Sequence, residues 1–224
     1  MTAGPIRRLR RLAFGLLKRT RDRRTLIQQW EDRAHRHGAR AVLNIGHSDA
    51  EVVQVTELQR HELYPHFRSA LRGDERVVLD FGCGPGRFTR DLGEMVQVRA
   101  IGVDPIQSLL DLAPRHPTVD YQLMPEGQIP LASGAVDAVW ICLVLGGIHG
   151  RTLEATIGEI QRVLRPGGLL FLVENTTEGG GSSFWAFRSV AQYQRLLRPI
   201  PLAHVHDYHD LGERISVMIG RKPA

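Results

Sequence analysis

The sequence contains only two cysteines in 224 residues, Cys83 and Cys142. Cys83 lies inside a glycine-rich turn and Cys142 inside a predicted buried strand, so the pair is too small and too specially placed for a disulfide framework. We therefore expect a reducing, cytoplasmic setting. The chain also lacks a long apolar run. Its longest, Ala138 to Leu145, is much shorter than a membrane span and is typical of a buried strand.

Internal repeats and low-complexity segments are absent as well. With 42% apolar residues, the chain is long enough to bury one core, which predicts a single globular domain. An export signal is not expected, because the apolar run from Leu12 to Leu17 is too short and no small-residue cleavage site follows it. An organelle transit peptide would share the arginine-rich, acid-poor composition of this segment, so that interpretation stays open.

Positive charge is concentrated near the start of the chain. Residues 1–40 hold 12 of the 29 Lys and Arg but only 3 of the 24 Asp and Glu, which gives this segment a net charge of +9 and leaves −4 for the rest. The remainder of the chain is therefore mildly acidic. A nucleic-acid enzyme usually carries its positive field beside the active cleft, so the charge distribution disfavours that class unless the basic segment folds there.

We divide the chain into a basic amphipathic helical arm (1–40), a helical extension (41–75) and one core (76–224). In residues 5–19 the apolar side chains fall within one helical arc of about 140°, and most cations fill the opposite arc. The apolar set is Ile6, Leu9, Leu12, Ala13, Leu16 and Leu17. Three interpretations of this stripe stay open. It packs on the protein's own body or on a second copy in a homodimer, it docks peripherally on an anionic membrane, or the arm contacts nucleic acid.

The end of the arm and the helical extension carry clear start and stop signals. One helix through Trp30 and Ala34 is expected to end at Gly38. Ser48-Asp-Ala-Glu51 is a capping box that opens another helix. We expect Pro65 to break this helix and to start a short new one. His47, His61 and His66 are candidate site histidines of this extension.

The central motif is Val77-Val-Leu-Asp-Phe-Gly-Cys-Gly-Pro-Gly86. A buried strand that runs into a glycine turn and then a helix is typical of a nucleotide-binding α/β unit. The glycines follow a Gly-x-Gly-x-Gly pattern, not the Gly-x-Gly-x-x-Gly of dinucleotide enzymes, which disfavours a dehydrogenase. Asp80 at the strand tip would repel a pyrophosphate but suits a ligand that carries an ammonium group.

A second strand, Ala100-Ile-Gly-Val-Asp104, ends in an acid 18 residues past Gly86. That separation is right for a carboxylate that accepts both hydroxyls of a ribose. Adenosine at one end and an amino acid at the other describe S-adenosylmethionine. The sequence thus resembles the class I S-adenosylmethionine-dependent methyltransferases, with motif I as Leu79 to Gly86 and the second motif as Gly102-Val-Asp104.

This resemblance implies a Rossmann-like α/β fold. It has a seven-stranded, mostly parallel sheet with helices on both faces, an antiparallel C-terminal hairpin and a helical N-terminal extension. It also implies S-adenosyl-L-methionine as cofactor. The expected cofactor-binding residues match the family's motifs or lie next to them in this sequence. They are Asp80, Gly82, Cys83, Gly84, Gly86, Asp104, Pro105, Glu126, Gly127 and Cys142.

Relatives often place a histidine or an acid in the two slots that hold Gly146 and Gly147 here. We expect the glycines to leave room for a bulkier acceptor. Trp185 is expected to begin the helix that follows strand five. The implied reaction is O-methylation of a small molecule or a saccharide, including a lipid-linked one, with a base that removes the hydroxyl proton. The candidate bases are His149, Glu174, Tyr193 and His209.

Dense histidines and acids in the segment His204-Val-His-Asp-Tyr-His209-Asp210 can indicate a metal site. Only His204 and His206 alternate along a strand, so we predict no metal and favour a solvated hairpin, with a pocket-wall or acid–base role as the alternative. Alternative functions are an RNA or other nucleic-acid methyltransferase that uses the basic arm, and a non-catalytic cofactor-binding protein. The nucleic-acid alternative is disfavoured because no Asp-Pro-Pro-Tyr-like tetrad and no Pro-Cys pair is present.

Overall fold

The structure is a computed structural model that describes residues 25–44, 46–125, 127–179 and 185–224. The amphipathic stretch of the basic arm and Glu126 lie outside these residues, so the expectations placed on them stay predictions. None of the described helices is both long and apolar enough to cross a lipid bilayer.

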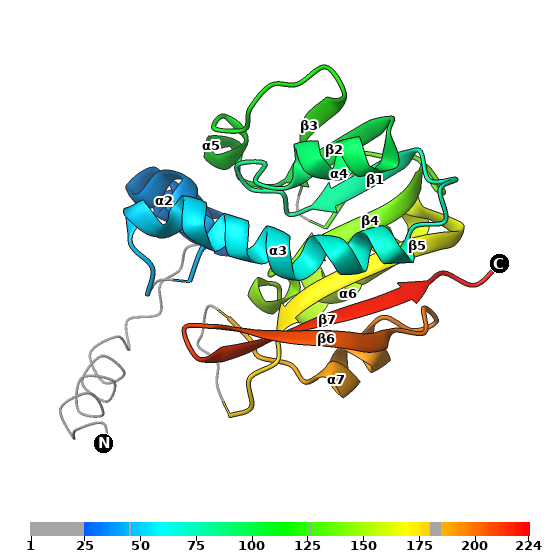
Figure 1. The fold of residues 1–224 in the computed structure, drawn as a ribbon. Helices are drawn as coiled ribbons and strands as arrows, with labels where there is room; N and C mark the ends of the chain where they lie inside the picture. Colours follow the sequence, from blue (N-terminus) through cyan, green and yellow to red (C-terminus); the bar gives the residue numbers. More distant parts are fainter. Residues whose placement is uncertain (1–24, 45, 126, 180–184) are drawn as a thin grey trace.

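Seven strands form one sheet in the order β3-β2-β1-β4-β5-β7-β6 (Figure 1). The neighbours from β3 to β5 pair in parallel, and β7 runs antiparallel to both β5 and β6. This order confirms the predicted Rossmann-like sheet with its antiparallel C-terminal hairpin. The strands are β1 (Val77–Phe81), β2 (Arg99–Asp104), β3 (Val119–Leu123), β4 (Val136–Cys142), β5 (Leu164–Asn175), β6 (Ala203–Asp210) and β7 (Glu213–Arg221).

Helices cover both faces of the sheet (Figure 1). Helices α3 and α4 bury their apolar residues against one face, and α6 and α7 bury theirs against the other. Helix α2 packs on α5 beyond the strand ends. The α-helices are α2 (Leu26–His37), α3 (Val52–Ala70), α4 (Thr89–Val96), α5 (Gln107–Leu110), α6 (Gly150–Val163) and α7 (Val190–Leu196); short 3-10 turns are η1 (Gly38–Val42), η2 (Asp49–Glu51) and η3 (Leu145–Gly147).

The central strand β4 shows why an uninterrupted apolar run becomes a strand buried on both faces. Trp140 is fully buried and stacks on Phe171 of β5, with ring centroids 4.6 Å apart. Phe67 of α3 meets the Trp140 ring edge-on at 5.3 Å. The aromatic stack therefore fastens the long helix α3 to the middle of the sheet.

Two local signals were predicted correctly and one was not. The α2 helix ends at His37 with Gly38 as its C-cap, and the Glu51 carboxylate accepts the Ser48 backbone N–H at 2.7 Å, as a capping box requires. Pro65, however, does not break α3, which continues through it to Ala70. Pro65 is exposed while Tyr64 and Phe67 are buried. The apolar face thus continues across the proline, and this burial offsets the hydrogen bond that proline cannot donate.

One further boundary differs from the predictions. Trp185 lies before α7, which starts at Val190, and not within that helix. The helix begins where Ser189 accepts the Gln192 N–H in a capping box. The cap, and not the first apolar residue, therefore fixes its start.

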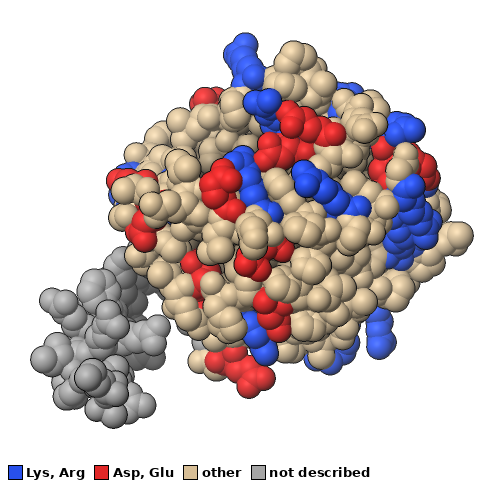
Figure 2. Space-filling view, viewed as in Figure 1, with Lys and Arg blue, Asp and Glu red and all other residues tan. Residues whose placement is uncertain are grey.

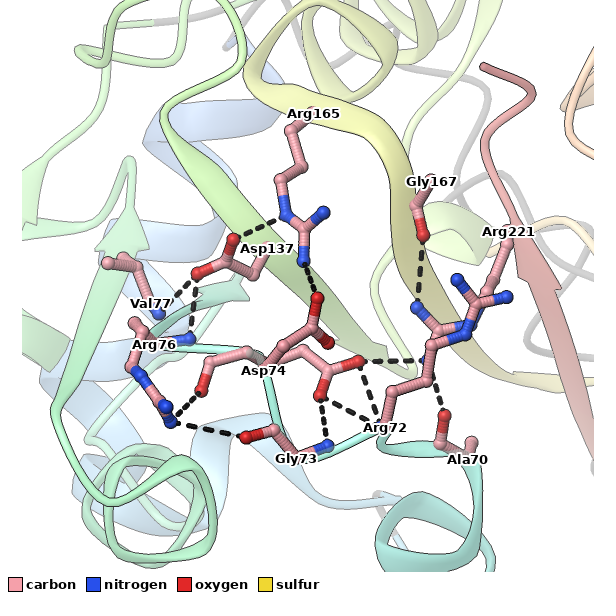
Figure 3. Close-up of polar contacts among 11 residues, drawn as sticks. Ala70, Arg72, Gly73, Asp74, Arg76, Val77, Asp137, Arg165, Gly167 and Arg221 are labelled. Atoms are coloured by element: carbon pink, nitrogen blue, oxygen red, sulfur yellow. Dashed lines mark hydrogen bonds and ion pairs between the residues drawn. The ribbon is translucent and has the colours of Figure 1, made fainter.

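A polar network joins five elements at the amino end of β1, the end of the sheet remote from the glycine turn (Figure 3). The Glu75 carboxylate, which is 2% exposed, accepts a hydrogen bond from Arg221 at 2.9 Å. Asp137 of β4 accepts the N–H groups of Arg76 and Val77, each at 2.8 Å. These contacts tie the end of α3 and the start of β1 to β4 and β7.

Candidate functional site

The site begins at the glycine turn that follows β1. Gly82 has φ +71°, and a Cβ there would lie 2.6 Å from a Val144 methyl group. Gly86 has φ +72°, and its Cβ would lie 2.3 Å from the Tyr121 hydroxyl oxygen. Both the left-handed backbone and the close neighbours exclude a side chain. The turn therefore packs tightly between the end of β4 and β3.

Asp80 lies in β1, two residues before Gly82, and its side chain is buried. The Thr89 hydroxyl at the start of α4 donates to its carboxylate at 2.6 Å. Burial raises the pKa of Asp80 to about 7, and the Thr89 hydrogen bond and Arg87 offset only part of that cost. A positively charged ligand beside this buried carboxyl group would stabilise its ionised form, so the position favours a cationic ligand.

Asp104 ends β2, the neighbouring strand, and links that strand to the glycine turn. Its two oxygens accept the backbone N–H of Gly84 at 2.8 Å and that of Ile106 at 2.9 Å. Burial raises the pKa of Asp104 to about 6 although both hydrogen bonds favour the ionised form. Each carboxylate oxygen retains a second lone pair for a ligand hydroxyl.

Both acids line one cavity of about 1230 Å³ at the carboxyl ends of β1, β2 and β4. Gly84 and Gly86 shape the turn but are not on the cavity wall, and Glu126 lies outside the described residues. Two buried carboxyl groups on one wall fit a ligand with a positive charge and ribose hydroxyls. Of the residues predicted to bind cofactor, the wall contains Asp80, Gly82, Cys83, Asp104, Pro105, Gly127 and Cys142.

Arg87 follows the glycine turn and lines the same cavity. Its guanidinium lies over the Phe88 ring at 4.6 Å and donates to Gln59 at 2.7 Å and Thr56 at 3.2 Å. Burial lowers the pKa of Arg87. No described carboxylate lies within ion-pair distance of it, although the charge of Asp80 acts on it from farther away. A cation in this position would gain from a ligand anion.

Trp185 corrects the expectation about the two glycines after β4. A Cβ on Gly146 would lie 2.2 Å from the Trp185 indole nitrogen, and one on Gly147 would lie 3.1 Å from the indole ring. The space beside these glycines is therefore filled by the indole and is not open to an acceptor. Trp185 itself lines the cavity and meets Trp30 of α2 edge-on at 6.5 Å.

Glu174 and Tyr193 were candidate bases, and the structure places both in a buried hydrogen-bond cluster. The Glu174 carboxylate accepts the backbone N–H groups of Val144, Leu145 and Gly146, at 3.0, 2.6 and 3.2 Å, and the Tyr193 hydroxyl at 3.2 Å. Burial raises the pKa of Glu174 to about 7. Neither side chain lines the cavity. Their contacts hold the turn after β4 in place.

His149 and His209, the other two candidates, also lie off the cavity wall. His149 is the residue before α6, and its Nε2 is buried with no hydrogen-bond partner among the described residues. His209 is exposed on β6. The catalytic roles of all four candidates stay predictions, and the structure does not bring these four residues together.

The remaining histidines of the C-terminal segment pair with acids at the surface. His204 contacts Asp207 at 2.8 Å, and His206 contacts Glu62 of α3 at 2.7 Å and stacks on His66. In the described part of the chain, no three His, Cys, Asp or Glu side chains are grouped as metal ligands.

Sequence reasoning missed a polar cluster on the cavity wall at the β6–β7 turn. The Asp210 carboxylate contacts the buried imidazole of His47 at 2.7 Å. The Glu213 carboxylate accepts the side-chain amides of Asn175 at 2.7 Å and Asn44 at 3.1 Å. His47 was a candidate, but nothing in the sequence pairs it with an acid 163 residues away.

Residues 79–172 match a protein-family model described as a methyltransferase domain. N-demethylindolmycin N-methyltransferase of Streptomyces griseus is 32% identical over 117 residues, which are 50% of this chain and 49% of that protein. An uncharacterised methyltransferase of Mycobacterium tuberculosis is 41% identical over 104 residues, 46% of this chain and 41% of that protein. The chain thus spans about half the length of these curated relatives.

Solved structures share the fold at low sequence identity. Phosphoethanolamine N-methyltransferase 1 of Haemonchus contortus was solved with phosphoethanolamine and S-adenosylhomocysteine. It superimposes with a TM-score of 0.65 at 17% identity, over 89% of this chain and 48% of that one.

Proposed function

Because this chain belongs to the class I S-adenosylmethionine-dependent methyltransferases, we propose that it methylates a hydroxyl group of a small molecule or saccharide. One observation carries the proposal. Asp80 and Asp104, from neighbouring strands, line a single cavity, and burial raises their pKa values to about 7 and about 6. Such carboxyl groups match the ammonium group and the ribose of S-adenosylmethionine.

The cofactor supplies an electrophilic methyl group on a sulfonium. The chain's residues bind and orient the two reactants, because a direct displacement depends on alignment and exclusion of water. Asp104 would hold the ribose, and Pro105 and Ile106 would lie against the adenine. Apolar side chains from the turn after β4, among them Leu143, Val144 and Ile148, would keep water from the reacting atoms.

A hydroxyl acceptor must also lose its proton. Asp210 supports this step better than the four residues expected from the sequence, because it lines the cavity and they do not. His47 holds one Asp210 oxygen at 2.7 Å, and no described residue hydrogen-bonds to the other. The free oxygen would accept the proton while the imidazole steadies the carboxylate.

Calorimetric titration with S-adenosylhomocysteine tests the cofactor site. We expect Asp104→Asn to weaken binding about 10–100-fold, since hydrogen bonds to a charged group are worth about 1.5–3 kcal/mol. Asp120→Asn is the matched control, because Asp120 is a half-buried β3 residue that pairs with Arg99 and is not on the cavity wall. No binding to wild type, or equal binding to Asp104→Asn, would contradict the assignment.

The charge distribution supports a small acceptor over nucleic acid. On the face shown in Figure 2, Lys and Arg side chains alternate with Asp and Glu and leave no continuous basic surface. Retention on heparin at physiological salt that is lost on deleting residues 1–24 would favour the nucleic-acid or anionic-surface alternative. A protein that only holds the cofactor would release no S-adenosylhomocysteine with any acceptor.

A further inference from the structure

We propose that the end of the cavity at the β6–β7 turn binds a neutral carbohydrate, which is the methyl acceptor. This inference rests on the proposed function and narrows its substrate class. The cavity volume of about 1230 Å³ exceeds the roughly 300–1000 Å³ of a typical small-ligand pocket. It therefore has room for a second ligand beside the cofactor.

The sheet order separates the two ends of the cavity. Asp80 lies on β1, and Glu213 begins β7, which is three positions away in the order β1-β4-β5-β7. Neighbouring strands are about 4.8 Å apart, so the two groups are separated by about 14 Å along the sheet. The acids near β1 and β2 are thus left for the cofactor, and the groups at the β6–β7 turn face a different ligand.

The polar groups at this turn are fixed by one another and retain bonding capacity. One Glu213 oxygen accepts both the Asn44 and the Asn175 amide, and one Asp210 oxygen accepts the His47 contact. Within the described chain no hydrogen bond reaches the second oxygen of either acid. Each amide nitrogen also has a second N–H group. Preset donors and acceptors side by side match a row of hydroxyl groups, each of which donates and accepts.

Aromatic rings line the same cavity beside the turn after β4. Trp30 and Trp185 contact edge-on at 6.5 Å, and Phe187 lines the same cavity. Large, rigid rings offer flat apolar surface at little conformational cost, and they suit the C–H faces of a sugar ring. Apolar faces and hydroxyl edges on one compact molecule are the properties of a carbohydrate.

The charge of the wall disfavours an anionic ligand. Once Asp80, Asp104 and Arg87 are assigned to the cofactor, three acids and two arginines remain: Asp32, Asp210, Glu213, Arg33 and Arg36. A phosphorylated acceptor would meet a net negative charge there. The polar end therefore recognises hydroxyl groups by hydrogen bonds, not a formal charge.

The test uses the full-length protein, S-adenosylmethionine with a radiolabelled methyl group, and an extract of the cells that make the protein. After acid hydrolysis we expect the label in an O-methyl monosaccharide. Label in an amine, a phenol, a fatty acyl ester, protein or nucleic acid would overturn the inference and leave methyl transfer intact. If no labelled product forms and no S-adenosylhomocysteine is released, both the inference and the proposed function fail.

Variants link the product to this end of the cavity. Asp210→Asn and Glu213→Gln should each lower labelling at least about tenfold, with S-adenosylhomocysteine affinity within about twofold of wild type. Asp207→Asn is the control, because Asp207 lies on the same strand as Asp210 but bonds to His204 and Ser216 and is not on the wall. Full labelling by both variants would overturn the inference. Because Glu213→Gln leaves the Asp210–His47 contact in place, a folding defect in Asp210→Asn alone would not remove the test.

Discussion

The indole of Trp185 lies against Gly146, so closely that a Cβ on the glycine would be 2.2 Å from the indole nitrogen. We expect Gly146→Ala to destabilise the protein by about 1–3 kcal/mol, because the added methyl group overpacks the turn after β4. Denaturant unfolding measures this change. Gly158→Ala is the control, since that exposed helical position has nothing within 4 Å and should gain up to about 1 kcal/mol from helix propensity.

A double variant checks the cause. If the indole is responsible, Gly146→Ala should cost less in a Trp185→Leu background than in wild type, and the coupling energy measures the contact. Equal costs in the two backgrounds would contradict the finding that Trp185 fills this space.

The second prediction concerns the network at the amino end of β1 (Figure 3). Burial alone would raise the pKa of Glu75, but the hydrogen bonds from Arg221 and backbone N–H groups outweigh it and hold that pKa below its usual range. Glu75→Gln should therefore destabilise the protein by about 1–3 kcal/mol at neutral pH. Glu57→Gln, at a side chain that is 60% exposed, should change stability by less than about 0.5 kcal/mol.

The pH dependence of this effect has a defined sign. Because the folded pKa of Glu75 is lowered, its contribution is present above the ordinary carboxyl value of about 4.3 and is lost as pH falls through the folded pKa. The difference between wild type and Glu75→Gln should then shrink in acid. A difference that grows in acid would contradict the assignment.

The third prediction is proton release on cofactor binding. The pKa of Asp80 is raised to about 7, so below that pH the free protein holds a proton that a cationic ligand must expel. The affinity for S-adenosylmethionine should rise as pH increases through about 7 and then level off. Calorimetry in buffers of different ionisation enthalpy measures the protons released.

The same raised values lower the stability of the free protein. An acid whose pKa is raised in the folded state makes the protein less stable as pH rises from the acid's ordinary pKa towards its folded pKa. The folded pKa is about 7 for Asp80 and about 6 for Asp104. Asp80→Asn should remove most of the pH dependence of binding near pH 7 and leave that of Asp104 at lower pH. Binding to wild type with no proton release near about pH 6.5 would contradict this account.

The sheet could be predicted from the sequence because its signals are local. The strand before the glycine turn and the strand that ends at Asp104 were predicted, since a run of strand-forming residues ends at a turn in each case. Asp80 and Asp104 were found for the same reason, as each lies at or next to the end of its strand. Pro65 misled the prediction because burial of Tyr64 and Phe67, a tertiary effect, outweighs the local preference of proline.

The acceptor end of the cavity could not be predicted in this way. Asp210 and His47 are 163 residues apart, and Asn44 and Glu213 are 169 apart, so no spacing along the chain connects them. Trp185 resembles the first apolar residue of a helix, and only the fold places it beside Gly146. Local patterns thus locate the cofactor residues, whereas the residues for the acceptor meet only when β6 and β7 join the sheet.

The last prediction is that Arg87 binds the carboxylate of the cofactor's amino-acid group. Its guanidinium is held by Gln59 and Thr56 beside the glycine turn, and no described carboxylate pairs with it. Arg87→Gln should weaken binding of S-adenosylhomocysteine about 10–100-fold, as expected for lost hydrogen bonds between charged groups. Binding of 5′-methylthioadenosine, which has the nucleoside and the thioether but no amino-acid group, should change less than about twofold.

The comparison of these two ligands separates a direct contact from a structural one. If Arg87 only braces the turn against α3, both ligands should lose affinity to the same extent, which would contradict the prediction. If neither ligand is affected, Arg87 does not contact the cofactor, which would also contradict the prediction. Arg90→Gln is the control, because Arg90 is an exposed α4 residue that pairs with Glu94.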